Sequence, residues 1–279
     1  MDLHAFVWDS SSLGPTTDEG PLRGMDVAVK DLFAVRGHVS SFGHPVWRST
    51  HSAAERDARV VQKTLGGGAR IVGLTKMDQL AYSLIGNVGE GTAPVNAFRP
   101  SAYCGGSSSG TASAVAGGEA TVGIGTDTAG SIRVPAAVCG LHGLRPTHGA
   151  IDADGAIPLA ASFDVIGLCA ATLAPMQRLH EQLAGSAVPT DLRRVLVADA
   201  PLGSTDEHGV LTSFAAALAK TLGTQVTSVP VGDFVSADAG DLLARVQGRR
   251  SGRRTAAGWR STATTSRTTY RRVWSDARC

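Results

Sequence analysis

Short apolar runs alternate with amphipathic or small-residue segments along the first 248 residues, and this pattern predicts strands and helices in turn. The apolar runs, each bounded by glycine or polar residues as buried strands are, span residues 24–35, 70–74, 121–125, 194–198 and 225–229. The segments with helical spacing or helical composition span residues 52–66, 77–84, 109–117 and 211–222. Because strands alternate with helices, we expect an α/β fold with a largely parallel β-sheet.

The predicted helix over residues 52–66 carries both a start and a stop signal. Ser52 and Glu55 match a capping box, in which the two side chains satisfy free backbone N–H groups at the start of a helix. An apolar face follows, and Gly66–Gly68 end the helix. Residues 86–103, in contrast, carry Gly, Pro and Asn at close intervals, so we expect a long loop there.

The composition changes at residue 249. From there to residue 279 the only branched aliphatic residue is Val273 and the only acidic one is Asp276, while Arg, Ser, Thr, Ala and Gly dominate. No helical or strand period survives in this part of the chain. We therefore expect one domain over residues 1–248 and a separate tail over residues 249–279. The tail is either a disordered basic segment, whose functional version would contact nucleic acid, or GC-rich DNA that is read out of frame.

Charge and composition exclude several classes of protein. A formal net charge of +2 on 279 residues is too small to indicate a nucleic-acid or membrane-surface protein. No apolar run approaches the length of a membrane span, and the N-terminus lacks the pattern of a signal peptide. The four cysteines show neither CxxC nor a disulfide-like spacing, so we expect reduced thiols in a cytoplasmic protein without a nucleic-acid or membrane partner.

Lys30 interrupts an otherwise apolar run, VAVKDLF, and has two interpretations. Taken alone, such a lysine is more often a surface residue whose stem covers apolar neighbours while its ammonium group stays in water. If the side chain is buried instead, desolvation favours the neutral amine and lowers its pKa, and the amine then serves as a general base near neutral pH. Whether the side chain of Lys30 is buried distinguishes the two interpretations.

A turn rich in glycine and serine, GGSSSG at residues 105–110, has three interpretations. In the first, it is a flexible turn before a helix, whose free N–H groups would also hold an anion. In the second, it is a nucleophile elbow with Ser108 as the nucleophile, although that motif needs a strand directly before it and residues 99–104 are a poor strand candidate. In the third, it forms a site together with a second hydroxyl-bearing turn downstream.

That second turn, GTDTAGSIR, directly follows the predicted strand over residues 121–125. The small residues before Ser131 let successive backbone N–H groups converge beside its Oγ atom, which is the geometry of an oxyanion hole. Asp127 and Arg133 are placed to form an ion pair across the turn. The alternative interpretation is a tight turn stiffened by this pair.

Together these motifs resemble the amidase signature family. GMDVAVKD, GGSSSG, GTDTAGSIRVPA and CGLHGLRPTHG occur in the order of the family, and the resemblance runs from about Leu22 to Met176. It implies the amidase-signature α/β fold, a central mixed or mostly parallel β-sheet that is covered by helices on both faces. The full domain of the family is much longer, so we expect the fold of this chain to be incomplete at its C-terminus.

The resemblance also implies the roles of individual residues. Ser131 matches the nucleophile, Ser107 the bridging serine and Lys30 the base, and the cis peptide bond of the family would here join Gly106 to Ser107. Ala129 stands where the family usually has glycine, which matters only if that residue needs a positive φ. The oxyanion-loop positions match Thr128, Ala129, Gly130 and Ser131, and the supporting positions match Ser108, Asp127 and Arg133.

The implied function is hydrolysis of the C–N bond of a small carboxamide to an acid and ammonia, through a Ser–Ser–Lys triad and an acyl-enzyme. We expect no metal or organic cofactor, and we expect a homodimer. Segments such as GAIPLAASFDVIG are most similar to the branch with plant indole-3-acetamide hydrolases, which suggests an arylacetamide substrate. Two alternatives stay open: an amidotransferase A-type subunit that releases ammonia from glutamine, and an inactive truncated fragment or interaction module like that of some chloroplast import receptors.

Other residues give weaker signals. His38, His44 and His51 lack the spacing of metal ligands, so ordinary polar histidines are expected. Asp152 and Asp154 resemble the start of a calcium loop but lack the glutamate further on. We therefore expect no metal site.

Overall fold

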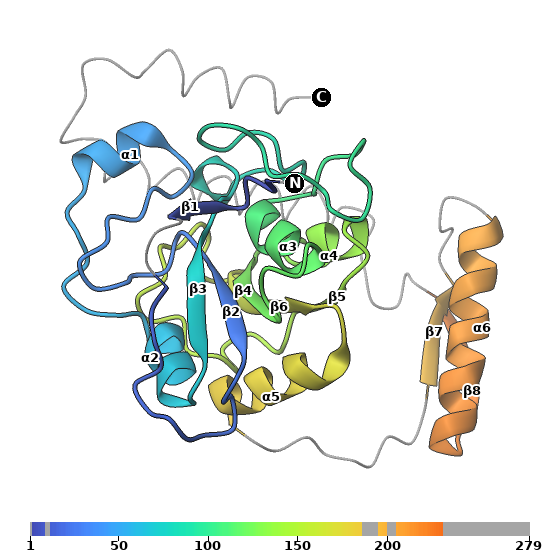
Figure 1. Cartoon of the computed structure of the whole chain (residues 1–279). Helices are drawn as coiled ribbons and strands as arrows, with labels where there is room; N and C mark the ends of the chain where they lie inside the picture. The colour runs from blue at the N-terminus through green and yellow to red at the C-terminus, as the bar shows by residue number, and fades with distance from the viewer. Residues whose placement is uncertain (1, 9–11, 186–194, 200–204, 231–279) are drawn as a thin grey trace. The chain divides into compact units, whose positions relative to one another are not determined.

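The structure is a computed structural model that describes residues 2–8, 12–185, 195–199 and 205–230 (Figure 1). These residues belong to two compact units, the first ending at Ser186 and the second spanning Ala187–Gly248. The predicted tail over residues 249–279 lies outside the described residues, so the domain boundary at residue 248 stays a prediction.

The first unit is built on a six-stranded mixed sheet with the strand order β1-β3-β2-β4-β6-β5 (Figure 1). Strand β2 pairs in parallel with β3 on one side and with β4 on the other, whereas the other three pairs are antiparallel. The strands are β1 (Phe6–Trp8), β2 (Asp26–Lys30), β3 (Arg70–Thr75), β4 (Val122–Asp127), β5 (His142–Leu144) and β6 (Val165–Ala170).

Helices cover both faces of this sheet. Val27 and Val29 of β2 belong to the larger core cluster, together with side chains of α2 and α5. Ala28 belongs to a second cluster with side chains of α3 and α4, because successive residues of a strand face opposite sides. The helices are α1 (Pro45–Thr50), α2 (Arg59–Gly66), the one-turn 3₁₀ helix η1 (Gln79–Ala81), α3 (Ser109–Ala116), α4 (Arg133–Val138) and α5 (Leu173–Ala184).

The second unit is a strand–helix–strand arrangement of β7 (Val195–Asp199), α6 (Thr205–Leu222) and β8 (Val226–Pro230), in which β7 and β8 pair in parallel. These three elements were all predicted from the sequence. On α6, Ala215 and Ala219 are buried, whereas Val210 and Phe214 are exposed apolar residues one turn apart.

Two helix predictions are wrong in detail. Helix α2 begins at Arg59 and not at the Ser52 capping box, because the backbone N–H groups of Ala54 and Ala58 donate to carbonyl groups of the 34–38 segment instead. The segment 77–84 forms only the one-turn helix η1. There the N–H group of Leu80 donates to the carbonyl of Phe42, a contact from another part of the chain that overrides the local helical preference.

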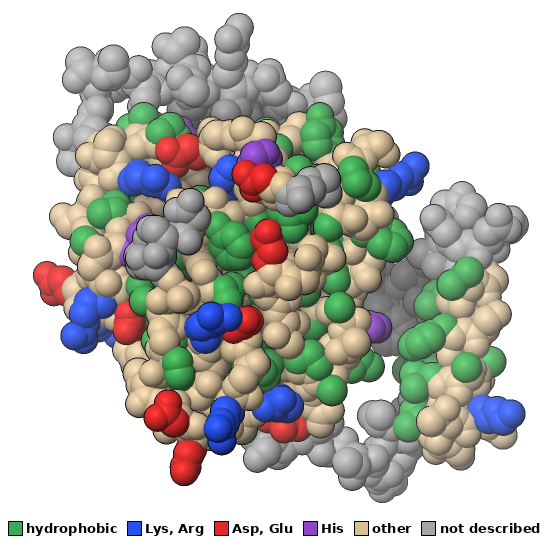
Figure 2. Space-filling model, in the orientation of Figure 1, with side chains coloured by type: hydrophobic (Ala, Val, Ile, Leu, Met, Phe, Trp, Pro, Cys, Tyr) green, Lys and Arg blue, Asp and Glu red, His purple; other side chains and the backbone are tan. Residues whose placement is uncertain are grey.

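The predicted α/β class with a mixed sheet and helices on both faces is confirmed. Acidic and basic side chains are interspersed over the face of the molecule drawn in Figure 2, in keeping with the small net charge. Among the described helices, none is both long and apolar enough to cross a membrane.

Candidate active site

Lys30 ends strand β2 with its side chain completely buried. Its Nζ atom lies 2.8 Å from Oγ of Ser107 and 3.0 Å from Oγ1 of Thr126. Burial lowers the pKa of Lys30 from 10.5 to about 7, against the opposing effect of nearby carboxylates. The interpretation of this lysine as an exposed surface residue is therefore wrong, and its amine is poised to exchange a proton near neutral pH.

Ser107 lies in the glycine turn before α3, and the peptide bond between Gly106 and Ser107 is cis, as the resemblance implied. The turn rests on Asp78, whose backbone N–H donates to the carbonyl of Ser107 at 3.1 Å. The carboxylate of Asp78 accepts the N–H groups of Gly86 at 2.9 Å and Val88 at 3.1 Å. Its Oδ2 also fills the place that a Cβ atom on Gly106 would take, so only glycine fits there.

Ser108 joins the two predicted turns. Its backbone N–H donates to the carbonyl of Ser131 at 3.3 Å, which fixes the Ser131 loop beside the Ser107 turn. Its hydroxyl donates to the carbonyl of Thr126 at 3.4 Å, and the side chain is buried. No strand occurs over residues 86–108, all of which are described, so the nucleophile-elbow interpretation of Ser108 is wrong.

Asp127, at the end of β4, anchors the loop that carries Ser131. Its Oδ1 accepts the N–H of Gly130 at 2.8 Å, and its Oδ2 accepts those of Ile132 at 3.3 Å and Arg133 at 3.2 Å. The N–H of Gly130, one of the four residues predicted for the oxyanion hole, is thus already engaged within the loop. Ser131 itself is almost completely buried, with 5% of its surface exposed.

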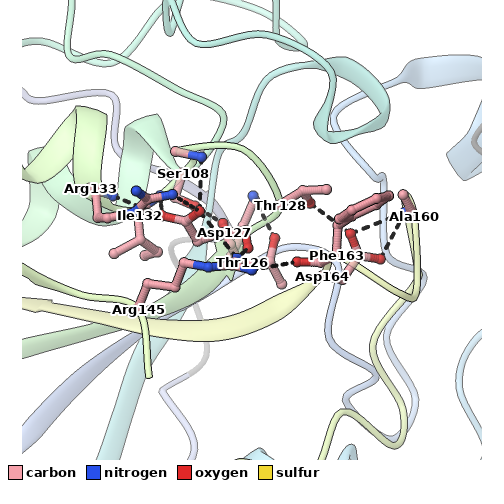
Figure 3. Close-up of polar contacts among 12 residues, drawn as sticks. Ser108, Thr126, Asp127, Thr128, Ile132, Arg133, Arg145, Ala160, Phe163 and Asp164 are labelled. Carbon is pink, nitrogen blue, oxygen red and sulfur yellow. Dashed lines mark hydrogen bonds and ion pairs between the residues drawn. The ribbon is translucent and has the colours of Figure 1, made fainter. Parts of the chain in front are cut away.

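Two arginines surround the carboxylate of Asp127 (Figure 3). The guanidinium of Arg133 forms the predicted ion pair with both oxygens at 2.9 Å, and Arg145 donates to the backbone carbonyls of Asp127 and Phe163. Burial by itself raises the pKa of Asp127, but the hydrogen bonds from Arg133 and Gly130 outweigh it and hold this pKa below 3.8. The loop is therefore anchored on a carboxylate that stays ionised.

Asp164, which the sequence did not single out, lies on the other side of the same loop (Figure 3). Its Oδ1 accepts the hydroxyl of Thr128 at 2.6 Å. Its negative charge is also one of those that act on Lys30. Thr128, the first residue of the predicted oxyanion loop, is thus fixed from outside the loop.

A mostly apolar pocket of about 210 Å³ is lined in part by Thr126, one of the two hydrogen-bond partners of Lys30. Thr126 and Asp164 are its polar lining residues, and Ala81, on a strained backbone with φ 57°, also lines it. The other lining residues are Leu32, Ala153, Ala156, Ile157, Pro158, Leu159, Ala161, Val165 and Ile166. Its size and lining suit a small apolar group rather than a charged one.

Residues 3–226 match the family model described as Amidase. The chain belongs to the amidase family.

Relatives of this amidase-family chain include plant proteins with different names. "Amidase 1" of Arabidopsis thaliana is 44% identical over 181 residues, which are 64% of this chain and 42% of that protein. "Translocon at the outer membrane of chloroplasts 64" of Pisum sativum is 39% identical over 181 residues, which are 64% of this chain and 30% of that protein. The chain thus spans less than half the length of either relative.

A solved structure described as the crystal structure of an amidase has the same fold. It superimposes with a TM-score of 0.73 at 30% sequence identity and covers 88% of this chain and 56% of that one. The fold predicted from the resemblance is therefore confirmed for the part of the chain that is matched.

One departure from the family pattern is harmless in this structure. Ala129 is not among the described non-glycine residues with a positive φ, and the residue is exposed. Alanine therefore fits at a position where the family usually has glycine.

The remaining sequence candidates have ordinary structural roles. His38 bonds to Asp31 at 3.0 Å, and His51 stacks on Trp47 with ring centroids 3.9 Å apart. Asp154 forms an ion pair with Arg56, and no group of described residues is arranged to hold a metal ion. Three cysteines are free, buried thiols (Cys104, Cys139 and Cys169), and Cys279 lies outside the described residues.

Proposed function

We propose that the chain hydrolyses the C–N bond of a small carboxamide, with Ser131 as the nucleophile, Ser107 as the bridging serine and Lys30 as the base. The observation that carries this proposal is the 2.8 Å contact between the buried amine of Lys30 and the hydroxyl of Ser107. A buried lysine with a pKa of about 7 is neutral in a large fraction of molecules at pH 7, and only the neutral amine accepts a proton.

The proposed reaction has two halves. Neutral Lys30 takes the proton of Ser107 as Ser107 takes that of Ser131, and the Oγ of Ser131 attacks the amide carbon. The C–N bond of the tetrahedral intermediate then breaks, the proton passes to the leaving nitrogen, and ammonia departs from the acyl-enzyme. Water attacks the ester through the same relay, which releases the acid and restores Ser131.

The oxyanion of the intermediate needs backbone donors beside Ser131. Because Asp127 already accepts the N–H of Gly130, the N–H groups of Ala129 and Ser131 are the proposed donors. The ion pair between Asp127 and Arg133 keeps the loop in shape while charge develops on the substrate.

The substrate proposed is an arylacetamide. The pocket of about 210 Å³ beside Thr126 has a mostly apolar lining, which agrees with an apolar acyl group. The cytoplasmic location and the homodimer also stay proposals.

An interaction module is the second candidate. The similarity to the pea protein named as a chloroplast translocon component favours it, since that name describes no hydrolysis. The two candidates differ in whether the hydroxyl of Ser131 is activated. The amidotransferase-type alternative differs from the first candidate only in its amide, glutamine.

Labelling of the full chain with a fluorophosphonate probe tests the proposal, because the probe forms a covalent bond only with an activated serine. We expect labelling of the wild type, none of Ser131→Ala, and full labelling of Ser52→Ala, which removes an exposed hydroxyl as a control. Ammonia release from phenylacetamide and from glutamine then separates the two enzymatic alternatives. A folded wild-type chain that is never labelled overturns the hydrolase proposal in favour of the interaction module.

A further inference from the structure

The pairing of β4 with β6 determines which residue lies opposite the start of the oxyanion loop. These strands are antiparallel, and their last ladder pair joins Asp127 to Val165. One step further along the same register, Thr128 lies opposite Asp164. A slip of one residue would turn the carboxylate to the other face of the sheet.

Asp164 is held by several hydrogen bonds. Besides the hydroxyl of Thr128 at 2.6 Å, its carboxylate accepts the N–H of Leu159 at 3.0 Å and that of Ala160 at 2.9 Å (Figure 3). Backbone donors of this kind fix the orientation of the carboxylate that they surround. The side chain therefore presents a fixed, charged acceptor to the oxyanion loop.

We propose that Asp164 is a positioning residue of the hydrolytic site: it holds Thr128, and through it the oxyanion loop, and its charge also acts on Lys30. This inference rests on the proposed function for its effect on rate, but its effect on Lys30 is independent of any activity.

Three carboxylates act on Lys30, namely those of Asp78, Asp127 and Asp164. Asp78 is engaged under the Ser107 turn, and Asp127 faces Arg133. Asp127 binds the oxyanion loop through the backbone N–H of Gly130, whereas Asp164 binds it through a side chain, the hydroxyl of Thr128. Asp164 therefore links the base to the first residue of that loop.

The coupling explains why a carboxylate is useful here. Burial alone favours a neutral Lys30, and a nearby negative charge moves its pKa back upward. A base whose pKa stays near the working pH both accepts and returns a proton efficiently. Removing the charge of Asp164 therefore makes Lys30 a weaker base at the same time as it loosens the loop.

Two measurements on the full chain test the inference, with three variants. Asp164→Asn removes the charge, Thr128→Val removes the hydrogen bond and leaves the charge, and Asp152→Asn makes the same chemical change at an exposed loop position as a control. The first measurement is the pH titration of Lys30 followed by the carbon-13 shift of its Cε atom. The second is the rate of fluorophosphonate labelling of Ser131 between pH 5.5 and 9.

For Asp164→Asn we expect the Lys30 inflection to fall by roughly half a pH unit below that of the wild type. We also expect the plateau labelling rate to fall about tenfold to hundredfold, as a small misplacement of catalytic groups does. Thr128→Val should lower the plateau without moving the inflection, and Asp152→Asn should change neither.

An unchanged Lys30 inflection in folded Asp164→Asn overturns the inference, whether or not the chain is active. So does a wild-type labelling rate in Thr128→Val. If the wild type is not labelled at all, the proposed hydrolase function fails, while the titration of Lys30 still decides the role of Asp164.

Discussion

The Nζ atom of Lys30 lies 2.8 Å from the Oγ atom of Ser107, 77 residues further along the chain, and neither side chain is exposed. Strand β2 delivers the lysine, and the turn before α3 delivers the serine. Burying an amine in this way disfavours its charged form, so the fold is less stable than it would be with an apolar side chain there. The buried position of Lys30 thus lowers the stability of the fold but favours the neutral amine that a general base requires.

The first prediction concerns stability and pH. The pKa of Lys30 is 10.5 when unfolded and about 7 when folded, so between these values the unfolded state binds more protons and stability rises with pH. The contribution is complete above pH 10.5 and is lost as the pH falls to 7. Relative to Lys30→Met, the wild type should therefore gain about 2 kcal/mol in unfolding free energy from pH 7 to pH 9.

Urea unfolding of both proteins at the two pH values measures this difference. Lys220→Met, which changes an exposed lysine on α6, is the control for the loss of a lysine as such and is measured in the same way. A constant difference between wild type and Lys30→Met would mean that Lys30 is not buried as a titrating group.

The second prediction concerns the pH dependence of reactivity. The labelling rate of Ser131 should fall as the pH drops through about 7, because protonated Lys30 accepts no proton. Lys30→Arg should react at least a thousandfold more slowly at every pH up to 9, since a guanidinium stays charged over this range. A rate that is flat from pH 5.5 to 9 in the wild type would contradict Lys30 as the base.

The sequence predicted the strands that carry the site better than the contacts that tune it. Lys30, Ser107 and Ser131 could be predicted because each lies within a short sequence motif, and these motifs occur in the order of the family. Asp78 and Asp164 did not follow, because their roles depend on which backbone groups lie beside them in space. Asp164 reaches Thr128 only through the register of two strands, which no local pattern encodes.

The difference between local patterns and long-range contacts also explains why strand β6 was not predicted and why the start of helix α2 was predicted wrongly. β6 is a short run buried along its whole length, and such a run has no alternation that separates a strand from a helix. The false capping box at Ser52 has the opposite cause: the local signal is present, but long-range backbone bonds at Ala54 and Ala58 prevail.

The third prediction compares the two partners of an ion pair. Asp127 is fully buried and accepts three backbone N–H groups as well as Arg133, whose own side chain is 53% exposed. Asp127→Asn should therefore lower the unfolding free energy by about 3–5 kcal/mol, because it leaves buried donors without an acceptor. Arg133→Gln should lower it by about 1 kcal/mol or less, since water replaces much of the lost contact.

Thermal or urea unfolding of the two variants at pH 7 checks this asymmetry. Equal losses would show that the guanidinium of Arg133, and not the loop backbone, accounts for most of the stabilisation by Asp127.

The fourth prediction concerns a glycine of β4 beneath the site. A Cβ atom on Gly125 would lie 2.6 Å from Oγ of Ser108 and 2.8 Å from Cδ1 of Ile132. Both neighbours are buried and belong to the turns that carry Ser107 and Ser131, so neither can move without shifting one of these turns. Gly125→Ala should lower the unfolding free energy by about 1–3 kcal/mol and slow the labelling of Ser131 by about a hundredfold.

Gly14→Ala is the matched control, because a Cβ atom there has no neighbour within 4 Å and the residue has no positive φ. It should leave both the stability and the labelling rate unchanged. If Gly125→Ala is less stable but is labelled at the wild-type rate, the Ser107 turn tolerates displacement. The proposed relay then does not depend on close packing of the Ser107 and Ser131 turns over β4. If both quantities fall together, the absence of a side chain at residue 125 is what allows the Ser107 and Ser131 turns to meet.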